Sequence, residues 1–349
     1  MQVICVVRSP YSEQHVPGAE IWLGTKTPGT EVPKRVSAIA SALADWPMVE
    51  ATSHSDEVLC AVHDFALVDH LRTIWSRWGD YGVERVVPYL FPTAGLLGDL
   101  PLREPFAPHA AAGRFCYDTM TLIGPGTWEA ARGAIDVALT CVDLIGAKTS
   151  DAAAIYGLTR PPGHHVTRSA HGGSCYLNNA AVAAEALRRA GHPRVVIVDV
   201  DAHHGNGTQD IFYARADVLY ASVHVDPGAG WFPHYAGFAD EVGVGAGAGA
   251  NLNLPLAPGT QDMLWLDAIR KIVQRVIDFG ATALVLSLGV DAAADDPESP
   301  LEITLDGYHR AGELLAVLGV PTVALQEGGY HLPTLGALVR ASLQGLTRR

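Results

Sequence analysis

The stretch VVIVDVDAHHGNG, residues 195–207, decides the fold class of this 349-residue chain. It opens with four β-branched residues and passes at once into acids, histidines and glycines. Apolar runs without alternation are typical of strands that are buried on both faces of a parallel sheet. Two further runs of this kind, residues 283–288 and 320–325, also end in polar or glycine-rich sequence. We therefore predict three strands of a parallel sheet whose carboxyl ends carry polar loops.

Helical patterns lie between these runs. Residues 178–190 are rich in alanine, and residues 263–279 place apolar residues at helical spacing. Strands that alternate with helices predict an α/β fold: a single domain, residues 1–349, with a mostly parallel central β-sheet and helices on both faces. In such folds ligands bind beyond the carboxyl ends of the strands, so the polar loops should converge on one site.

Composition and charge narrow the function classes. Apolar residues make up 48% of the chain and charged residues 17%, which suits a large buried core and excludes a mainly disordered chain. Acidic residues outnumber basic ones by 37 to 24, a net charge of −13. This balance argues against a nucleic-acid partner, which needs a basic face, and favours a small cationic substrate.

The sequence suggests neither a membrane span nor an export signal. Residues 1–7 hold one short apolar run, which we interpret as a buried first strand. The longest apolar stretch, residues 281–290, is about half of what a bilayer span requires. The five cysteines are odd in number, scattered and outside any CxxC pair, which predicts reduced thiols and a cytoplasmic location.

Residues 81–127 differ from the rest of the chain. They are rich in proline and glycine and carry several aromatic residues. A long irregular insertion in a compact domain is usually functional or an interface. We expect this one near the active-site entrance or at a dimer interface; the alternative is a solvated surface loop.

The strongest chemical signal is the alternation of Asp199, Asp201 and His203. In extended chain, residues two apart point the same way, so these three would share one side. Two carboxylates and one imidazole suit Zn²⁺, Fe²⁺ or Mn²⁺. The alternative, capping aspartates and surface histidines, does not explain four ionisable groups in six residues at a strand end.

Catalytic metal sites commonly have three protein ligands, so a further ligand is expected. Asp291 follows the strand predicted at residues 283–288, at the same edge of the sheet. Alone, Asp291 would more readily be a helix cap before residues 292–294. Beside the first cluster it is the best candidate for the third ligand.

Two other loops carry groups that could do acid–base chemistry. The run RPPGHH, residues 160–165, presents His164 and His165, which could supply a general base and a general acid. Asp199 and Asn206 are available to set their tautomers. In EGGY, residues 327–330, two glycines allow a close backbone approach, and Tyr330 could donate its hydroxyl to an oxyanion.

Other chemistries lack their motifs. The chain contains no GxSxG elbow and no GxGxxG fingerprint. Residues 243–249, GVGAGAG, come near the latter with the wrong spacing, and we interpret them as a tightly turning loop.

Together these motifs resemble the zinc-dependent histone deacetylase family. The matching segments, in chain order, are RPPGHH (160–165), GGSCYLNNAAVAA (172–184), VDVDAHHGNGTQDIFY (198–213), FPH (232–234), GVDAAADDP (289–297) and EGGY (327–330). The likeness covers nearly the whole chain and implies an arginase/deacetylase fold. PGTWEAA (125–131), DIFY (210–213) and the insertion before them are most similar to bacterial acetylpolyamine amidohydrolases.

The resemblance assigns roles to residues of this chain. It implies a metal held by Asp201, His203 and Asp291. It also implies a catalytic pair, His164 and His165, with His165 as the main general base and acid. The assisting residues would be Asp199 as partner of His164, Asn206 beside His165, and Tyr330 as oxyanion donor. Asn206 stands where some members have Asp, and a neutral partner should leave the imidazole less basic.

The family also binds structural potassium. The resemblance implies an inner site, mostly of backbone oxygens, from Asp199, Asp201, His203, Ser222 and Val223. It implies an outer site near Phe212, Arg215 and Val218.

Substrate contacts follow from the same likeness. Ser174 stands where many members have an aromatic residue that lines the acyl-lysine tunnel, and Phe232 matches the opposite wall, so one wall should be wider or more polar. Gly173, beside Ser174, is also expected to contact the substrate. Glu20 matches a glutamate near the entrance of the bacterial acetylpolyamine amidohydrolases. Glu298 occupies a mouth position that is Glu in a member specialised for polyamines; otherwise it is a solvated surface residue. Ala112 falls roughly where those relatives have an acidic residue.

The function implied is removal of acetyl groups from acetylated polyamines or similar small cationic amines, by a metal-activated water. The predicted cofactors are Zn²⁺, with Fe²⁺ or Mn²⁺ as alternatives, and structural K⁺; the predicted assembly is a homodimer. One alternative is a deacylase of acyl-lysine in proteins or of another small amide. Another is an inactive relative that only binds a ligand. A manganese ureohydrolase of the arginase fold is disfavoured by the His-His pair and Tyr330.

Overall fold

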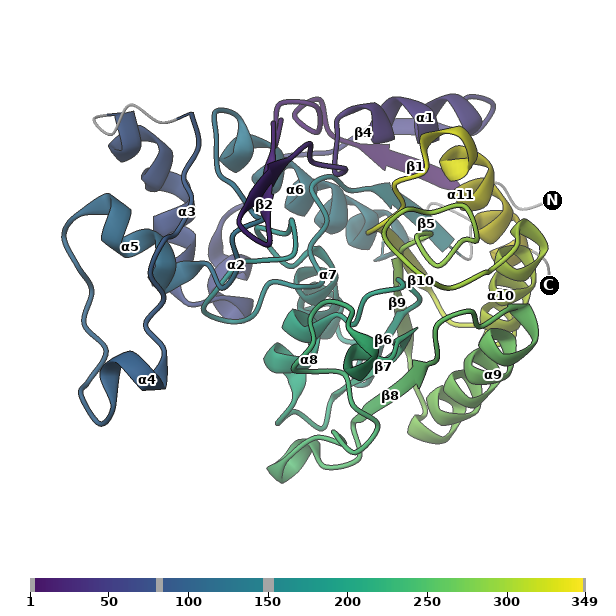
Figure 1. Cartoon of the computed structure of the whole chain (residues 1–349). Helices are drawn as coiled ribbons and strands as arrows, with labels where there is room; N and C mark the ends of the chain where they lie inside the picture. Colours follow the sequence, from purple (N-terminus) through teal and green to yellow (C-terminus); the bar gives the residue numbers. More distant parts are fainter. Residues whose placement is uncertain (1–3, 80–83, 147–153, 348–349) are drawn as a thin grey trace.

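The computed structural model describes residues 4–79, 84–146 and 154–347 (Figure 1). Its centre is an eight-stranded sheet with the strand order β4-β1-β5-β10-β9-β6-β7-β8, and every neighbouring pair is parallel. The strands, in chain order, are β1 (Cys5–Arg8), β4 (Met48–Glu50), β5 (Ala154–Leu158), β6 (Val195–Asp199), β7 (Val218–Val225), β8 (Asn251–Leu256), β9 (Ala283–Leu288) and β10 (Thr322–Gln326). The predicted parallel α/β architecture is confirmed.

The three strands predicted from apolar runs are all present. β6 extends one residue beyond the predicted run, β9 matches it, and β10 begins two residues later. All of their residues are buried, as strands covered on both faces require. The first strand, β1, begins at Cys5, and residues 1–3 of the predicted run lie outside the described residues.

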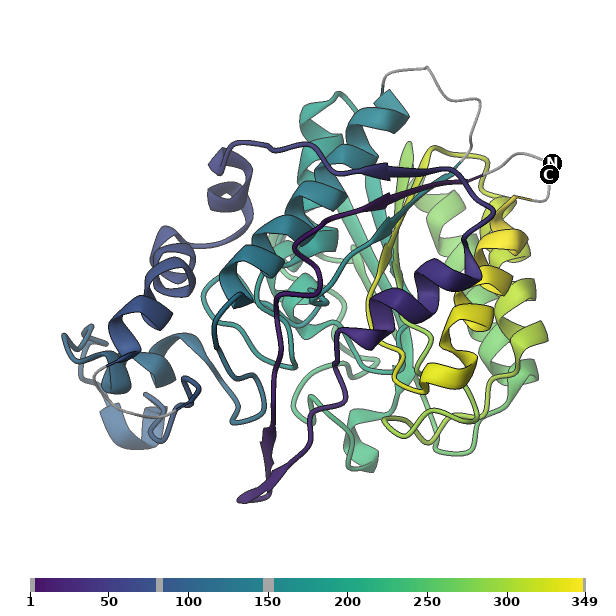
Figure 2. The same cartoon turned by 90° about the horizontal axis from the view of Figure 1, so that it is seen from above.

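Helices cover both faces of the sheet (Figure 2). Alternate strand residues explain the two layers: Val195 and Ile197 belong to one apolar core, whereas Val196 and Val198 belong to the other. The first core is closed by α2 (Glu57–Val62), α3 (Phe65–Trp78), α5 (Pro108–Phe115), α6 (Thr127–Gly146), α7 (Asn179–Arg189) and α8 (Asn206–Phe212). The second is closed by α1 (Lys34–Ala42), α9 (Asp262–Phe279), α10 (Leu305–Ala316) and α11 (Leu332–Leu346).

Two smaller segments stand apart from the sheet. The antiparallel hairpin β2 (Glu20–Trp22) and β3 (Thr25–Thr27) follows β1. Helices α4 (Ala94–Leu97) and α5 lie in the predicted insertion, and Figure 1 shows them at one end of the molecule, beside α3. Residues 81–83 of the predicted insertion lie outside the described residues.

The polar loops follow the carboxyl ends of β5, β6, β9 and β10, which adjoin in the sheet. The glycine-rich run at 243–249 forms a loop around one turn of 3₁₀-helix, as its composition predicts. No helix in the described part of the chain is both long and apolar enough to cross a membrane.

Candidate metal and catalytic centre

Asp201, His203 and Asp291 converge beyond the ends of β6 and β9. Each offers a ligand atom, and these atoms all lie within 4.8 Å of one another. The imidazole Nδ1 of His203 lies 3.0 Å from Asp291 Oδ2 and 3.3 Å from Asp201 Oδ1. The backbone holds both carboxylates, because Gly328 N–H donates to Asp201 and Ala202 N–H donates to Asp291.

The charges at this point favour a cation. Asp201 and Asp291 are completely buried. Burial and the neighbouring Asp201 charge raise the pKa of Asp291 to about 7. Burial opposes protonation of His203, but its hydrogen bonds to the two carboxylates raise its pKa well above the ordinary value. Two oxygen donors and one nitrogen donor fit a divalent transition metal.

The expectation that Asp199, Asp201 and His203 share one side is wrong for Asp199. Its carboxylate turns away from the ligand group, accepts from the Tyr220 hydroxyl at 3.1 Å and lies 3.0 Å from His164 Nδ1. The reason is that β6 ends at Asp199 and the chain bends through 201–203, so the extended alternation stops there.

The two histidines of the RPPGHH loop lie side by side, with ring centroids 4.0 Å apart. His165 Nδ1 lies 2.8 Å from the Oδ1 atom of Asn206, as His164 does from Asp199 at 3.0 Å. The nearby charges of Asp201 and Asp199 overcome burial and raise the pKa of His164 to about 10. Burial and the charge of His164 lower the pKa of His165 well below its ordinary value. Such a split is typical of paired groups with different catalytic roles.

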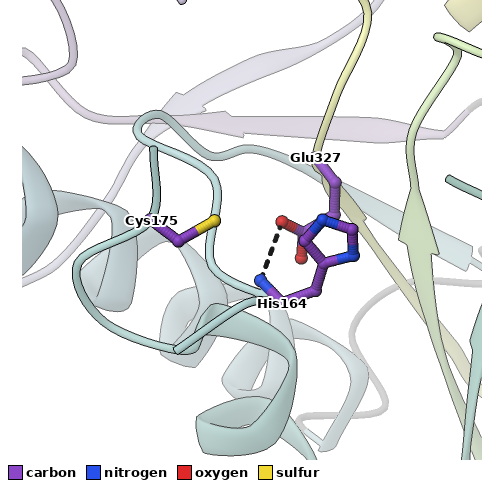
Figure 3. A group of neighbouring side chains, drawn as sticks. All are labelled: His164, Cys175 and Glu327. Atoms are coloured by element: carbon purple, nitrogen blue, oxygen red, sulfur yellow. Dashed lines mark hydrogen bonds between the residues drawn. The ribbon is translucent and has the colours of Figure 1, made fainter. Parts of the chain in front are cut away.

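His164, Cys175 and Glu327 form a second group of potential ligands (Figure 3). Glu327 Oε2 already accepts the backbone N–H groups of Gly163 (2.7 Å) and His164 (3.2 Å). Burial raises the pKa of the Cys175 thiol well above its ordinary value, which disfavours the thiolate that a metal needs. We therefore interpret Glu327 as the residue that anchors the histidine loop to the end of β10.

The Tyr330 loop is held from beneath by Arg35. The guanidinium donates to the carbonyl of Gly329 (2.6 Å) and lies 4.9 Å from the Tyr330 ring centroid. Glu31 balances this buried charge at 2.8 Å and contacts Arg160 at the same distance. A Cβ atom on Gly328 would lie 2.3 Å from Asp291 Oδ2, which explains the close approach that two glycines predict.

The sequence analysis missed Arg35 and Glu31. No motif marks either residue, because their side chains become buried only once the fold brings distant segments together. It also missed Asp296, whose Oδ2 accepts from the backbone N–H groups of Tyr330 (2.6 Å) and His331 (3.1 Å). Asp296 Oδ1 accepts from the N–H of Glu298 at 3.0 Å.

These groups open into a pocket of about 400 Å³. His165, His203 and Tyr330 line it, and so do all four residues predicted to contact substrate: Glu20, Gly173, Phe232 and Glu298. Its other lining residues are Trp22, Thr27, Pro28, Thr30, Met120, Ser174, Gly230, Trp231 and Pro297. The hairpin residues among them carry no motif, so the sequence did not indicate their place.

The two carboxylates that line the pocket come from segments far apart in the chain. Glu20 begins β2, and Glu298 follows the metal-ligand loop after β9. Partial burial and the charge of Glu298 raise the pKa of Glu20 to about 7. Ala112 does not line the pocket, because it is buried within α5.

The candidate potassium residues lie beside β6 and β7. Asp199 pairs with Ser222 in the sheet register, and Val223 follows Ser222 within β7. Phe212 ends α8 and Val218 begins β7. Arg215 N–H donates to the Phe212 carbonyl at 2.9 Å, between these elements. Ion binding at either place stays a prediction.

Comparison with known proteins decides the family. Residues 29–346 match the model of the histone deacetylase domain. The chain belongs to the histone deacetylase family. The likeness predicted from the motifs is therefore confirmed, and with it the class: a hydrolase of the deacetylase type that acts on linear amides.

Within the histone deacetylase family, the chain is similar to bacterial enzymes over almost its full length. It is 39% identical to the acetylpolyamine amidohydrolase of Mycoplana ramosa, over 97% of this chain and 99% of that protein. It is 40% identical to acetylpolyamine amidohydrolase 1 of Pseudomonas aeruginosa, over 97% and 98%. The crystal structure of acetylpolyamine aminohydrolase from Burkholderia pseudomallei superposes with a TM-score of 0.91 at 37% identity, covering 98% of both chains. The arginase/deacetylase fold is thus confirmed.

Proposed function

We propose that this protein is a metal-dependent amidohydrolase that removes acetyl groups from acetylated polyamines or similar small cationic amines. The observation that carries the proposal is the pair of carboxylates, Glu20 and Glu298, in the same pocket as His165, His203 and Tyr330. The relatives named acetylpolyamine amidohydrolases support the same substrate class.

Asp201, His203 and Asp291 would hold the metal. Their donor set suits Zn²⁺, and Fe²⁺ or Mn²⁺ are the alternatives. A divalent ion there would polarise the acetyl carbonyl and lower the pKa of the attacking water.

The chain's own groups would move the protons. His165 Nδ1 is hydrogen-bonded to Asn206, so its Nε2 is available to accept the proton of the attacking water and pass it to the departing amine. Asp199 orients His164 in the same way. Tyr330 donates its hydroxyl to the developing oxyanion, an interaction typically worth a few kcal/mol in the transition state.

Glu20 and Glu298 would select the substrate by charge. When the acetyl group reaches Tyr330, a second ammonium of a polyamine would lie beside these two carboxylates. A partly desolvated ion pair there contributes roughly 1–3 kcal/mol, about ten- to a hundredfold in kcat/KM.

A second candidate is deacylation of acyl-lysine in proteins or of another small amide. Ser174 favours it, because a small polar residue lines the wall where many relatives have an aromatic ring, and the pocket there can take a wider acyl group.

A panel of acetylputrescine, acetylcadaverine, acetylspermidine and acetyl-lysine peptides, scored by kcat/KM, tests the proposal. We expect the acetylpolyamines to exceed the peptides by at least about tenfold, the lower end of the ion-pair effect. Faster turnover of the peptides would favour the second candidate, and no turnover of any substrate by metal-loaded protein would indicate an inactive relative.

We also propose a homodimer, assembled through the insertion at 81–127, with structural K⁺ at the two sites named above. Large apolar side chains exposed between α3 and α6 support such an interface: Tyr89, Leu90, Leu96, Leu100 and Phe106.

Five unpaired cysteines support a cytoplasmic location, where thiols stay reduced.

A further inference from the structure

Tyr117 lies directly beside the catalytic histidine loop and has no part in the chemistry described so far. It follows α5, and its backbone N–H donates to the carbonyl of His171. Its ring is held from two sides: a Cβ atom on Gly172 would lie only 2.3 Å from it, and Phe232 stacks on it with centroids 6.3 Å apart and planes 15° apart. The position of the hydroxyl is therefore well defined.

The hydroxyl group of Tyr117 faces two polar groups. It donates to the backbone carbonyl of His165 at 2.8 Å, and it lies 3.4 Å from the amide nitrogen of Asn206. A phenol has one proton to donate, and the carbonyl uses it. Toward Asn206, the Tyr117 oxygen can therefore only accept.

The direction of these hydrogen bonds fixes the orientation of the Asn206 amide. Its NH₂ end must face Tyr117, so its Oδ1 end faces His165 Nδ1 at 2.8 Å. An amide oxygen only accepts, so the proton of the neutral imidazole must sit on Nδ1. The opposite nitrogen, Nε2, is then the one that carries the free lone pair.

We propose that Tyr117 is a positioning residue that selects the His165 tautomer through Asn206. The chain of hydrogen bonds is closed, because it begins at the backbone carbonyl of His165 and returns to its ring. The inference rests on the proposed function, in which His165 Nε2 accepts the proton of the attacking water. A carboxylate in place of Asn206 would need no such control, since both of its oxygens accept; an amide has one end of each kind and can be inverted.

Tyr117→Phe removes only the hydroxyl and keeps the ring against Gly172 and Phe232. Without the acceptor, Asn206 can turn its NH₂ toward His165 and stabilise the wrong tautomer. We expect kcat for acetylputrescine to fall about tenfold or more, with KM within about twofold of native. The lost hydrogen bond weakens the preference for the productive tautomer of His165, and His165 acts in the transition state.

A double-mutant cycle separates this role from a structural one. In the Asn206→Asp background, Tyr117→Phe should lower kcat by less than about twofold, since no amide remains to be inverted. Asn206→Ala supplies a second background with the same expectation. Any folding loss caused by Tyr117→Phe would recur in all backgrounds and cancel in the comparison. The same fold-loss in the native and both substituted backgrounds, or no loss in the native one, would overturn the inference.

Two controls keep the inference apart from the proposed function. If His165→Ala retains native turnover, the proposed mechanism is wrong, because it requires His165 as the general base. If His165→Ala is inactive while Tyr117→Phe is fully active, only the inference fails. The ¹⁵N shifts of the His165 ring, assigned by their loss in His165→Ala, should report the Nδ1–H tautomer in the native protein and a mixture in Tyr117→Phe.

Discussion

Tyr330 is the residue whose role is most sharply defined by its position. It lines the pocket with His165 and His203, and Asp296 and Arg35 hold its loop. We expect Tyr330→Phe to lower kcat by about 10²- to 10³-fold with KM nearly unchanged, because the hydroxyl acts mainly on the developing oxyanion. Steady-state kinetics on acetylputrescine measure this, and Tyr235→Phe, at a highly exposed tyrosine, serves as the matched control. A rise in KM alone would mean that Tyr330 only binds the ground state.

Glu298 provides the test of substrate charge. Glu298→Leu and the isosteric Glu298→Gln should both lower kcat/KM for acetylpolyamines by about ten- to a hundredfold. Both should leave a neutral acetyl-lysine substrate nearly unaffected, because only the second ammonium meets the carboxylate. Equal losses on the two substrates, or none on either, would make Glu298 a solvated surface residue.

Glu20 predicts a pH dependence. Burial and the charge of Glu298 raise the pKa of Glu20 to about 7, so its carboxyl group is ionised above pH 7 and becomes neutral as the pH falls through that value. The KM for a cationic acetylpolyamine should therefore rise between about pH 8 and pH 6. Kinetics across this range should give a flat KM in Glu20→Gln. An unchanged slope in that variant would assign the titration to another group.

Among the elements, the loop between β9 and α10 is expected to connect catalysis with specificity. Asp296 accepts N–H groups from Glu298 on its own loop and from Tyr330 on the loop after β10. Asp296→Ala leaves these donors unpaired, and we expect it to destabilise the fold by about 1–3 kcal/mol. It should also lower kcat and the preference for cationic substrates together. Denaturant unfolding and the substrate panel measure both effects; Asp295→Ala, an exposed neighbour, should change neither.

At the same scale, the parts of the fold that were predictable from sequence are the buried ones. β6 and β9 are continuous apolar runs because helices cover both faces of the sheet, and such runs can be recognised in a single sequence. β4 and the hairpin β2–β3 are three-residue strands that are largely exposed or half-buried, so they lack a pattern. The bend after Asp199 was not foreseeable either, because alternation predicts side-chain direction only while the strand lasts.

The residues of the site also differ in how far the sequence predicts them. Asp201 and His203 are only two residues apart in the sequence and chemically distinctive, so a metal site could be predicted there. Arg35 donates to the carbonyl of Gly329, which lies almost the whole chain away, and Tyr117, within the insertion, donates to the carbonyl of His165. Neither carries a motif, since each role exists only once the fold has brought the two segments together.

For the whole molecule, the insertion predicts assembly. Phe106 is almost completely exposed and Tyr89 and Leu100 are mostly exposed, which is costly for a monomer in water. We expect light scattering at micromolar concentration to give a dimer, and Phe106→Glu with Leu100→Glu to give a folded monomer. Intact histones should be poor substrates of the native protein because the dimer would narrow the entrance. A native monomer, or fast deacetylation of histones, would contradict this.

The central claim is that a metal ion at Asp201, His203 and Asp291 is required to deacetylate polyamines. The most direct measurement is turnover of acetylputrescine by protein stripped with a chelator, before and after one equivalent of Zn²⁺ is restored. We expect stripping to abolish turnover and Zn²⁺ to restore it, whereas Asp291→Ala should stay folded but neither retain the metal nor recover turnover. Full turnover by metal-free native protein would contradict a metal-dependent mechanism.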